Sequence, residues 1–339
     1  MSNSTAAGNN PSAPEMNALN AYLDAGDLLR TERECRGMLQ RYPGSAMLNN
    51  LLGIVFYTNG RSTEAMNCYQ LAIKSDPGYA DAHNNMGLLL NSLGRNKEAI
   101  ESFENVVKLN PDDTDALNNL GVLLQEQHRA EEALRYLSRA IKLSPNSAPV
   151  HFNYGNSLRA RGLLKEAVAM FGRAIQLQPD FAESYNNCAG AFEDLQLLDE
   201  ASNCYSRAIQ LQPTYALAYS NRGALQKKRS NHEAALQDFR HTLEYGNWTS
   251  DRIDQNLKFR LLVNIGDILM YLRRFAEALD AYEKAHAAEP ENSDILAFKG
   301  NAIAAMGRLA EGLRLRQASF GFIAFDNKAG VSIKHGAQQ

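Results

Sequence analysis

Apolar residues recur at steps of three and four positions along most of the chain, with polar residues between them. After residue 80 they form two groups, one on each side of the short turn Leu93-Gly94-Arg95. The groups are Met86, Leu89, Leu90 and Leu93 before the turn, and Ala99, Ile100, Phe103 and Val107 after it. This spacing places each group on one face of a helix. The pattern predicts two amphipathic helices that pack as an antiparallel hairpin.

The hairpin pattern repeats with a fixed period. Prolines stand 34 residues apart, at Pro43, Pro77, Pro111, Pro145, Pro179 and Pro213. Glycine stands 24 residues before most of them, and the same register continues later, at Gly53, Gly87, Gly121, Gly155, Gly223, Gly266 and Gly300. Alanine stands 12 residues before the prolines, at Ala65, Ala99, Ala133, Ala167 and Ala201, and the same register continues with Ala235 and Ala278. Most copies also carry an aromatic residue eight positions before the proline, at Tyr69, Phe103, Phe171 and Tyr205, and the same register later gives Phe239 and Tyr282. A regular period of this length indicates a stack of similar units.

Each repeated position has a packing reason. Glycine and alanine let two helix axes approach closely, while the large apolar residues fill the space beside them. Proline cannot continue a helix, so it ends each unit and serves in the turn before the next one.

The 34-residue pattern of Leu-Gly, Tyr, Ala, Phe, Ala and Pro resembles the tetratricopeptide repeat (TPR) family. The resemblance covers residues 12–326, which are 315 of the 339 residues, and the copies are 12–45, 46–79, 80–113, 114–147, 148–181, 182–215, 216–249, 259–292 and 293–326. It implies an all-α protein, a right-handed α-solenoid of about nine TPR hairpins. It also implies that the first helix of each hairpin lines an inner, concave groove, mainly through its second, fifth, sixth, ninth, twelfth and thirteenth residues.

Two departures from the period lie inside the array. The first copy has Leu19 and Thr31 where glycine and alanine are expected, as is typical of a terminal copy that packs on one side only. Between copies seven and eight the register slips by nine residues, the insertion 250–258. Because this stretch is compatible with a helix, we expect a lengthened first helix in copy eight. We expect Trp248 to pack over this joint, with a role in binding as the alternative.

The two ends of the chain do not follow the repeat. Residues 1–11 are polar, and we expect them to be disordered. In the C-terminal tail, which includes 327–339, the β-prone runs Phe320–Phe325 and Val331–Ile333 flank the turn-rich segment Asp326–Gly330. They predict a β-hairpin, a short non-repeat cap on copy nine. The alternative is the beginning of a further domain.

Composition narrows the class of protein. Hydrophobic residues make up 45% of the chain and charged residues 22%, which suits a folded protein with a large core. The net charge of −3 disfavours nucleic acid as a partner. No two of Cys35, Cys68, Cys188 and Cys204 have CxxC spacing, so we expect buried thiols in a reducing compartment. The chain shows neither a secretory signal nor an apolar run long enough to insert in a membrane, and we expect a cytoplasmic protein.

Motifs for catalysis are missing from the sequence. It contains no GxGxxG, GxxxxGK[ST], HExxH or GxSxG pattern and no dense group of cysteine and histidine. His83 and His151 share one position of the repeat, where a packing role is more common than metal binding. We therefore expect no enzymatic activity, no cofactor and no metal site.

The sixth position of the first helix is asparagine in six successive copies: Asn85, Asn119, Asn153, Asn187, Asn221 and Asn264. An asparagine amide both donates and accepts hydrogen bonds, so it can pair with the main chain of an extended peptide. The row resembles the asparagine ladder in the repeat arms of protein O-GlcNAc transferases and SPINDLY-type fucosyltransferases. The alternative is that these side chains bond only to the backbone of the neighbouring hairpin or to water.

Other positions of the implied groove supply anchors and charge. The apolar candidates are Tyr57, Phe152, Tyr271 and Phe298. The acidic positions are Asp81, Asp115, Glu126, Glu183, Glu193 and Asp194, and the basic ones are Arg159, Lys227, Lys228 and Arg260. We expect basic segments to bind the earlier copies and acidic segments to bind near copies seven and eight. The alternative is that these charges are scattered by chance.

The resulting hypothesis is a non-catalytic scaffold that binds extended peptide segments of a partner protein in the concave groove. A second hypothesis is a substrate-recognition arm or accessory subunit of a protein-modifying enzyme such as a glycosyltransferase. A third is a self-assembling structural scaffold, that is, a homo-oligomer. The carboxylate clamp of TPR proteins that bind chaperone C-termini does not map well, because the fifth position lacks lysine from the second copy onward.

Overall fold

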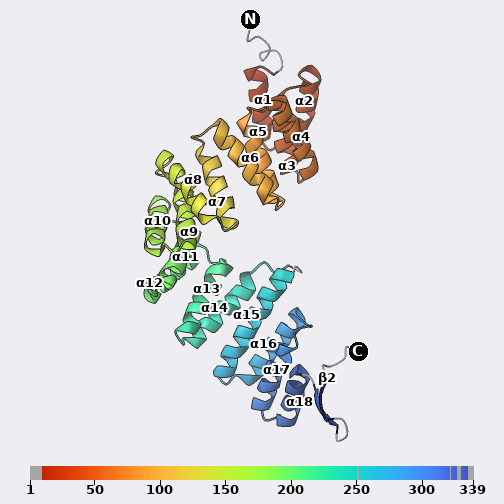
Figure 1. Cartoon of the computed structure of the whole chain (residues 1–339), viewed down its shortest axis with the longest axis vertical. Helices are drawn as coiled ribbons and strands as arrows, with labels where there is room; N and C mark the ends of the chain where they lie inside the picture. Colours follow the sequence, from red (N-terminus) through yellow and green to blue (C-terminus); the bar gives the residue numbers. More distant parts are fainter. Residues whose placement is uncertain (1–9, 250–251, 321, 327–329, 335–339) are drawn as a thin grey trace. The chain divides into compact units, whose positions relative to one another are not determined.

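A computed structural model describes residues 10–249, 252–320, 322–326 and 330–334 (Figure 1). The chain divides into two compact units, up to Pro179 and from Asp180 onward. The helices of the first unit are α1 (Ala13–Asp24), α2 (Leu28–Arg41), α3 (Ala46–Thr58), α4 (Ser62–Ser75), α5 (Ala80–Ser92), α6 (Asn96–Leu109), α7 (Thr114–Glu126), α8 (Ala130–Leu143), α9 (Ala148–Ala160) and α10 (Leu164–Leu177). Those of the second are α11 (Ala182–Asp194), α12 (Leu198–Leu211), α13 (Ala216–Lys228), α14 (His232–Tyr245), α15 (Arg252–Tyr271), α16 (Phe275–Ala288), α17 (Asp294–Ala305) and α18 (Leu309–Phe320).

Consecutive helices pair as hairpins, and the hairpins stack within each unit. In the first unit α4 contacts α5, α6 contacts α7 and α8 contacts α9. In the second unit α12 contacts α13, α14 contacts α15 and α16 contacts α17. The predicted helical repeat is therefore confirmed, while the right-handed superhelix stays a prediction.

The repeated glycine makes room for the large residue of the second helix. A Cβ atom added at Gly53 would lie 2.4 Å from the ring of Tyr69, and one at Gly266 would lie 2.3 Å from the ring of Tyr282. The same relation joins Gly87 to Phe103, Gly121 to Leu137, Gly155 to Phe171 and Gly223 to Phe239. Tyr69 and Tyr282 are fully buried. The glycine and the large residue, 16 positions apart, thus form the interlocking contact of each hairpin.

The repeated alanine is equally confined. Ala167 on α10 has 0% of its surface exposed. We expect Ala167→Leu to lower the free energy of unfolding by about 1–3 kcal/mol, because the larger side chain overpacks the contact between helices. Urea unfolding followed by circular dichroism measures this change. Ala169→Leu on the exposed face of the same helix is the control, and an equal loss in both variants would contradict the packing role.

The register slip appears as an elongated helix. The first helix of copy eight, α15, has 20 residues, whereas α13 has 13. Trp248 lies half-buried just before it and packs against the cluster that contains Leu262, and its Nε1 donates a hydrogen bond to the carbonyl oxygen of Leu243 at 2.9 Å. The expected lengthened helix and the packing of Trp248 at the joint are both confirmed.

The ends of the chain differ from the repeat. Leu19 and Thr31 are both buried in the first hairpin, at the positions where other copies have glycine and alanine. Within the predicted disordered segment 1–11, residues 1–9 lie outside the described residues, whereas Pro11 is buried and Asn10 accepts a hydrogen bond from Ser45.

Two short strands follow α18, β1 (Phe322–Asp326) and β2 (Gly330–Lys334). They pair antiparallel, with Phe322 opposite Lys334 and Asp326 opposite Gly330. The residues between the strands, 327–329, lie outside the described residues. The role of these strands as a cap stays a prediction.

The cysteines lie mostly in the apolar interior. Cys35, Cys68 and Cys188 are buried free thiols, and Cys204 is partly buried. Burial raises the pKa of Cys68 to about 11, which suits a packing role.

In the part of the chain that the structure describes, no helix is both long and apolar enough to span a bilayer.

Candidate functional site

The predicted asparagine row lies on the first helices of six successive hairpins. Asn85, Asn119 and Asn153 belong to α5, α7 and α9 of the first unit. Asn187, Asn221 and Asn264 belong to α11, α13 and α15 of the second. All six residues are half-buried, so part of each residue remains at the surface.

In the first unit two members of the row are bonded to the preceding hairpin. Nδ2 of Asn85 donates to Oδ1 of Asn50 on α3 at 2.9 Å. Nδ2 of Asn153 donates to Oδ1 of Asn118 on α7, also at 2.9 Å. In both cases the acceptor stands 35 residues earlier, at the fifth position of the preceding copy. The sixth-position asparagine thus bridges to a side chain, whereas the sequence suggested only backbone or water as structural partners.

The second unit repeats this bridge once and then changes it. Nδ2 of Asn221 donates to Oδ1 of Asn186 at 3.1 Å, and Nδ2 of Asn186 donates to Oδ1 of Asn187 at 3.0 Å. Asn264 follows the nine-residue slip and instead accepts a hydrogen bond from Nζ of Lys227 at 2.6 Å. The regular asparagine bridge therefore gives way to a lysine contact at the joint before α15.

The four candidate apolar anchors fall into two classes. The ring of Phe152 lies 6.0 Å from that of Phe171, and the ring of Phe298 stacks on Tyr282 at 5.6 Å. These two residues are half-buried: Phe152 packs within its own hairpin, whereas Phe298 on α17 packs on α16 of the preceding hairpin. Tyr57 and Tyr271 stand at the ends of α3 and α15, and their exposed fractions are 39% and 69%. These two offer more surface to a partner.

The predicted charges are also distributed between the units. Asp81, Asp115 and Glu126 are exposed on the first helices of the first unit, and Arg159 is half-buried on α9. In the second unit Glu183 and Asp194 are exposed, Lys227 is half-buried, and Lys228 and Arg260 are exposed. Nζ of Lys228 lies 4.0 Å from a carboxylate oxygen of Glu193, which forms a weak surface ion pair.

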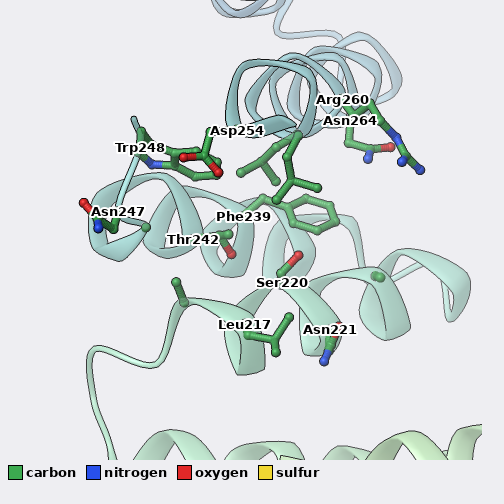
Figure 2. A pocket seen from close by; sticks show the side chains of 15 residues that line it. Leu217, Ser220, Asn221, Phe239, Thr242, Asn247, Trp248, Asp254, Arg260 and Asn264 are labelled. Carbon is green, nitrogen blue, oxygen red and sulfur yellow. The ribbon is translucent and has the colours of Figure 1, made fainter. Parts of the chain in front are cut away.

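Figure 2 shows a pocket in the second unit, between α13, α14 and α15, which we call the joint pocket. Its volume is about 440 Å³, and it brings together three of the predicted site residues, Asn221, Arg260 and Asn264. The apolar part of its lining includes Leu217, Ala224, Phe239, Trp248, Leu257 and Leu261. Leu217 and Leu257 are more than half exposed. Neither leucine was predicted as a site residue, although the register slip marks the place where the pocket forms.

The joint pocket also contains one carboxylate, that of Asp254. The backbone N–H and the hydroxyl of Thr249 both donate to Oδ2 of Asp254, the former at 3.0 Å. These hydrogen bonds, chiefly that from the hydroxyl, lower the pKa of Asp254. The carboxylate therefore stays ionised at neutral pH and is already engaged by the segment before α15.

The two histidines of the repeat have a packing role, as predicted. Both are buried, and Nε2 donates to the carbonyl oxygen of a proline that closes the preceding copy: His83 to Pro77 at 3.1 Å and His151 to Pro145 at 2.9 Å. Within the described ranges no three histidine, cysteine or acidic side chains are grouped so that they could hold a metal ion.

Several solved structures are similar to this chain. A tetratricopeptide repeat protein from Parabacteroides merdae aligns over 72% of this chain and 96% of its own, with a TM-score of 0.59 and 19% identity. Pseudomonas aeruginosa pilF aligns over 62% of this chain and 96% of its own, with a TM-score of 0.56 and 22% identity. Human IFIT1, solved as a dimer with PPP-AAAA, aligns over 90% of this chain and 81% of its own, with a TM-score of 0.54 and 14% identity. At these identities the likeness concerns the fold alone.

Sequence comparison identifies the repeat directly. No curated protein matches the chain. Family models described as tetratricopeptide repeat match residues 84–148 and 259–292, and a model described as TPR repeat matches residues 53–91, 155–196 and 194–230. Together these ranges cover more than half of the chain. With its hairpins, its interlocking glycines and these matches, the chain belongs to the tetratricopeptide repeat family.

Proposed function

We propose that the chain is a non-catalytic protein–protein interaction scaffold that binds extended peptide segments of a partner along its first helices. The observation that supports this proposal is the set of bridges Asn85–Asn50, Asn153–Asn118 and Asn221–Asn186. An asparagine side chain has two N–H donors and a carbonyl acceptor, and each bridge uses one donor of the sixth-position residue. The bridge fixes the direction of a half-buried amide, so less side-chain entropy is lost when a peptide binds.

Such a row suits the main chain of a peptide better than particular side chains. A net gain of about 0.5–1.5 kcal/mol for each hydrogen bond is close to the cost of about 1–2 kcal/mol for ordering each peptide residue. The row alone therefore gives weak, sequence-tolerant binding. Affinity and specificity must come from side-chain anchors and from charge.

The structure offers a matched pair of variants that separates binding from packing. Asn85→Ala with Asn153→Ala removes the proposed reading amides, whereas Asn50→Ala with Asn118→Ala breaks the same two bridges from the acceptor side. Both double variants should lose similar stability, about 0.5–1.5 kcal/mol for each bond. Only the first should lose most of the binding to fluorescein-labelled, blocked dodecapeptides, measured by fluorescence polarisation. Equal loss of binding in the two variants would show that the asparagines act through packing.

We propose a protein or peptide partner, a cytoplasmic location that fits the buried free thiols, and a capping role for β1 and β2. The likeness of the asparagine row to the arms of O-GlcNAc transferases and SPINDLY-type enzymes raises the second hypothesis, delivery of a bound segment to an enzyme. Co-purification followed by a transferase assay of the complex tests it, and a partner without transferase activity would speak against it.

A further inference from the structure

The joint pocket occupies the place of a missing asparagine bridge. In three copies the sixth-position asparagine bonds to the fifth position of the preceding copy, as Asn221 bonds to Asn186. At the joint the corresponding residues are Asn264 and Ser220, and both line the pocket. Asn264 accepts a hydrogen bond from Lys227 instead. The nine-residue slip therefore coincides with an opening at the position where the asparagine bridge stands in these three copies.

The opening is apolar at its base and at its rim. Phe239 and Leu261 are buried in its wall, and Leu217 and Leu257 are 53% and 54% exposed at its mouth. Exposed leucines beside a cavity of about 440 Å³ are unfavourable in water and favour an apolar occupant. Asn221 and Asn264 contribute amides beside this apolar surface, so a bound segment can keep its main chain hydrogen-bonded there.

The acidic and the basic residue of the joint pocket lie on different sides of it. Figure 2 places Asp254 beside Trp248 and Arg260 beside Asn264, on different sides of the pocket. Thr249 already bonds to Asp254, whereas Arg260 is exposed. Lys228, at the end of α13, is exposed but lies 4.0 Å from the carboxylate of Glu193, so Arg260 is the cation of the pocket. This arrangement favours an acidic residue of the occupant on the side of Arg260.

On the basis of the proposed function, we infer that the joint pocket binds a large apolar side chain of a partner protein segment in which that residue is flanked by acidic residues. The apolar side chain enters between Leu217 and Leu257, and a neighbouring carboxylate pairs with Arg260. The pocket thereby supplies the specificity that the asparagine row lacks.

The protein carries its own reporter for this inference. Trp248 is the single tryptophan of the chain, and it lines the joint pocket. Tryptophan-free, blocked dodecapeptides with a central leucine or serine, each in an acidic and in a basic version, serve as probes. The acidic leucine peptide should change the emission of Trp248 saturably, and the serine and the basic peptides should bind about tenfold or more weakly. Equal binding of the leucine and serine peptides overturns the inference.

Two variants test the pocket in the intact chain. Ala224→Leu fills it, and Leu88 occupies the equivalent position of copy three, so the fold accommodates leucine there. Ala234→Leu, at an exposed position of α14, is the matched control. Ala224→Leu should weaken the acidic leucine peptide about tenfold or more while the control binds normally. Arg260→Glu should reverse the charge preference, so that the basic leucine peptide becomes the better ligand.

The outcomes separate this inference from the proposed function. If labelled peptides bind and depend on Asn85 and Asn153 while Ala224→Leu has no effect, the pocket inference alone fails. If no peptide binds to the protein, the proposed function fails with it. If the emission of Trp248 depends on protein concentration without any peptide, and Ala224→Leu abolishes that dependence, a second copy of this chain occupies the pocket and the inference is overturned.

Discussion

Adding a methyl group at Gly312 is expected to lower the free energy of unfolding of the last hairpin by about 3 kcal/mol. The added Cβ would lie 2.4 Å from the carbonyl oxygen of Gly300 on α17 and 2.9 Å from Cβ of Ala304. In copies two to eight the corresponding residue is alanine, but here the two helices approach through a glycine on each side. Because the added carbon meets backbone, relief requires α17 and α18 to move apart. Hydrogen exchange of the amides of these two helices measures the loss.

Gly172→Ala is the matched control for this prediction. Gly172 also lies within a helix, α10, but an added Cβ there would meet nothing within 4 Å. We expect this substitution to stabilise the protein by about 0.5–1 kcal/mol, because alanine loses less backbone entropy on folding than glycine does. If both variants shift stability in the same direction, the close approach of α17 and α18 is not the cause.

The second large effect is expected for Asp238→Ala, a loss of about 3 kcal/mol in the free energy of unfolding of the second unit. Asp238 on α14 accepts two hydrogen bonds from Arg222 on α13, at 2.9 Å from Nε and 2.7 Å from Nη2. The side chain of Asp238 is 5% exposed and that of Arg222 is 23% exposed. The bond to Asp238 raises the pKa of Arg222, so truncation leaves a charged guanidinium without its carboxylate in a largely buried site. Urea unfolding followed by the emission of Trp248 reports this loss.

The double variant Arg222→Met with Asp238→Leu distinguishes a stranded charge from a general loss of packing. An apolar pair of similar size removes both charges, so we expect it to recover most of the stability lost in Asp238→Ala. Arg222 also donates to the hydroxyl of Ser206 on α12 at 3.0 Å, and this hydrogen bond is lost in the double variant. A double variant no more stable than Asp238→Ala would mean that the ion pair itself stabilises the contact of these three helices.

The repeat could be predicted from the sequence because its signal is local and periodic. The spacing of Gly266 and Tyr282 specifies which side chain fills which gap, and the structure shows that contact within one hairpin. The lengthened α15 was predictable for a similar reason, since residues 250–258 keep a helix-compatible composition. In each case the relevant partners lie close together in the sequence.

The site could be predicted only in part. The position of Asn85 on the first helix of its hairpin follows from the period, but its bond to Asn50 depends on how two hairpins stack. Phe152 and Phe298 share the groove positions of the family, yet the ring of Phe152 also reaches the second helix of its own hairpin and that of Phe298 the second helix of the preceding one. A helix face is wide enough that period alone does not separate a packed aromatic from an exposed one. The joint pocket depends on three helices at once, and no short motif marks such an arrangement.

The elongation of α15 also bears on how a repeat protein acquires new specificity. The helix has 20 residues instead of 13, and the difference is close to two turns at about 3.6 residues per turn. Because the extra turns precede residue 259, copy eight keeps its own period. Gly266 therefore contacts Tyr282 as Gly53 contacts Tyr69 in copy two. The joint thus acts as a spacer that can be inserted at a hairpin boundary. A pocket can thus be added by the length of one helix while the packing contact of its hairpin stays in register.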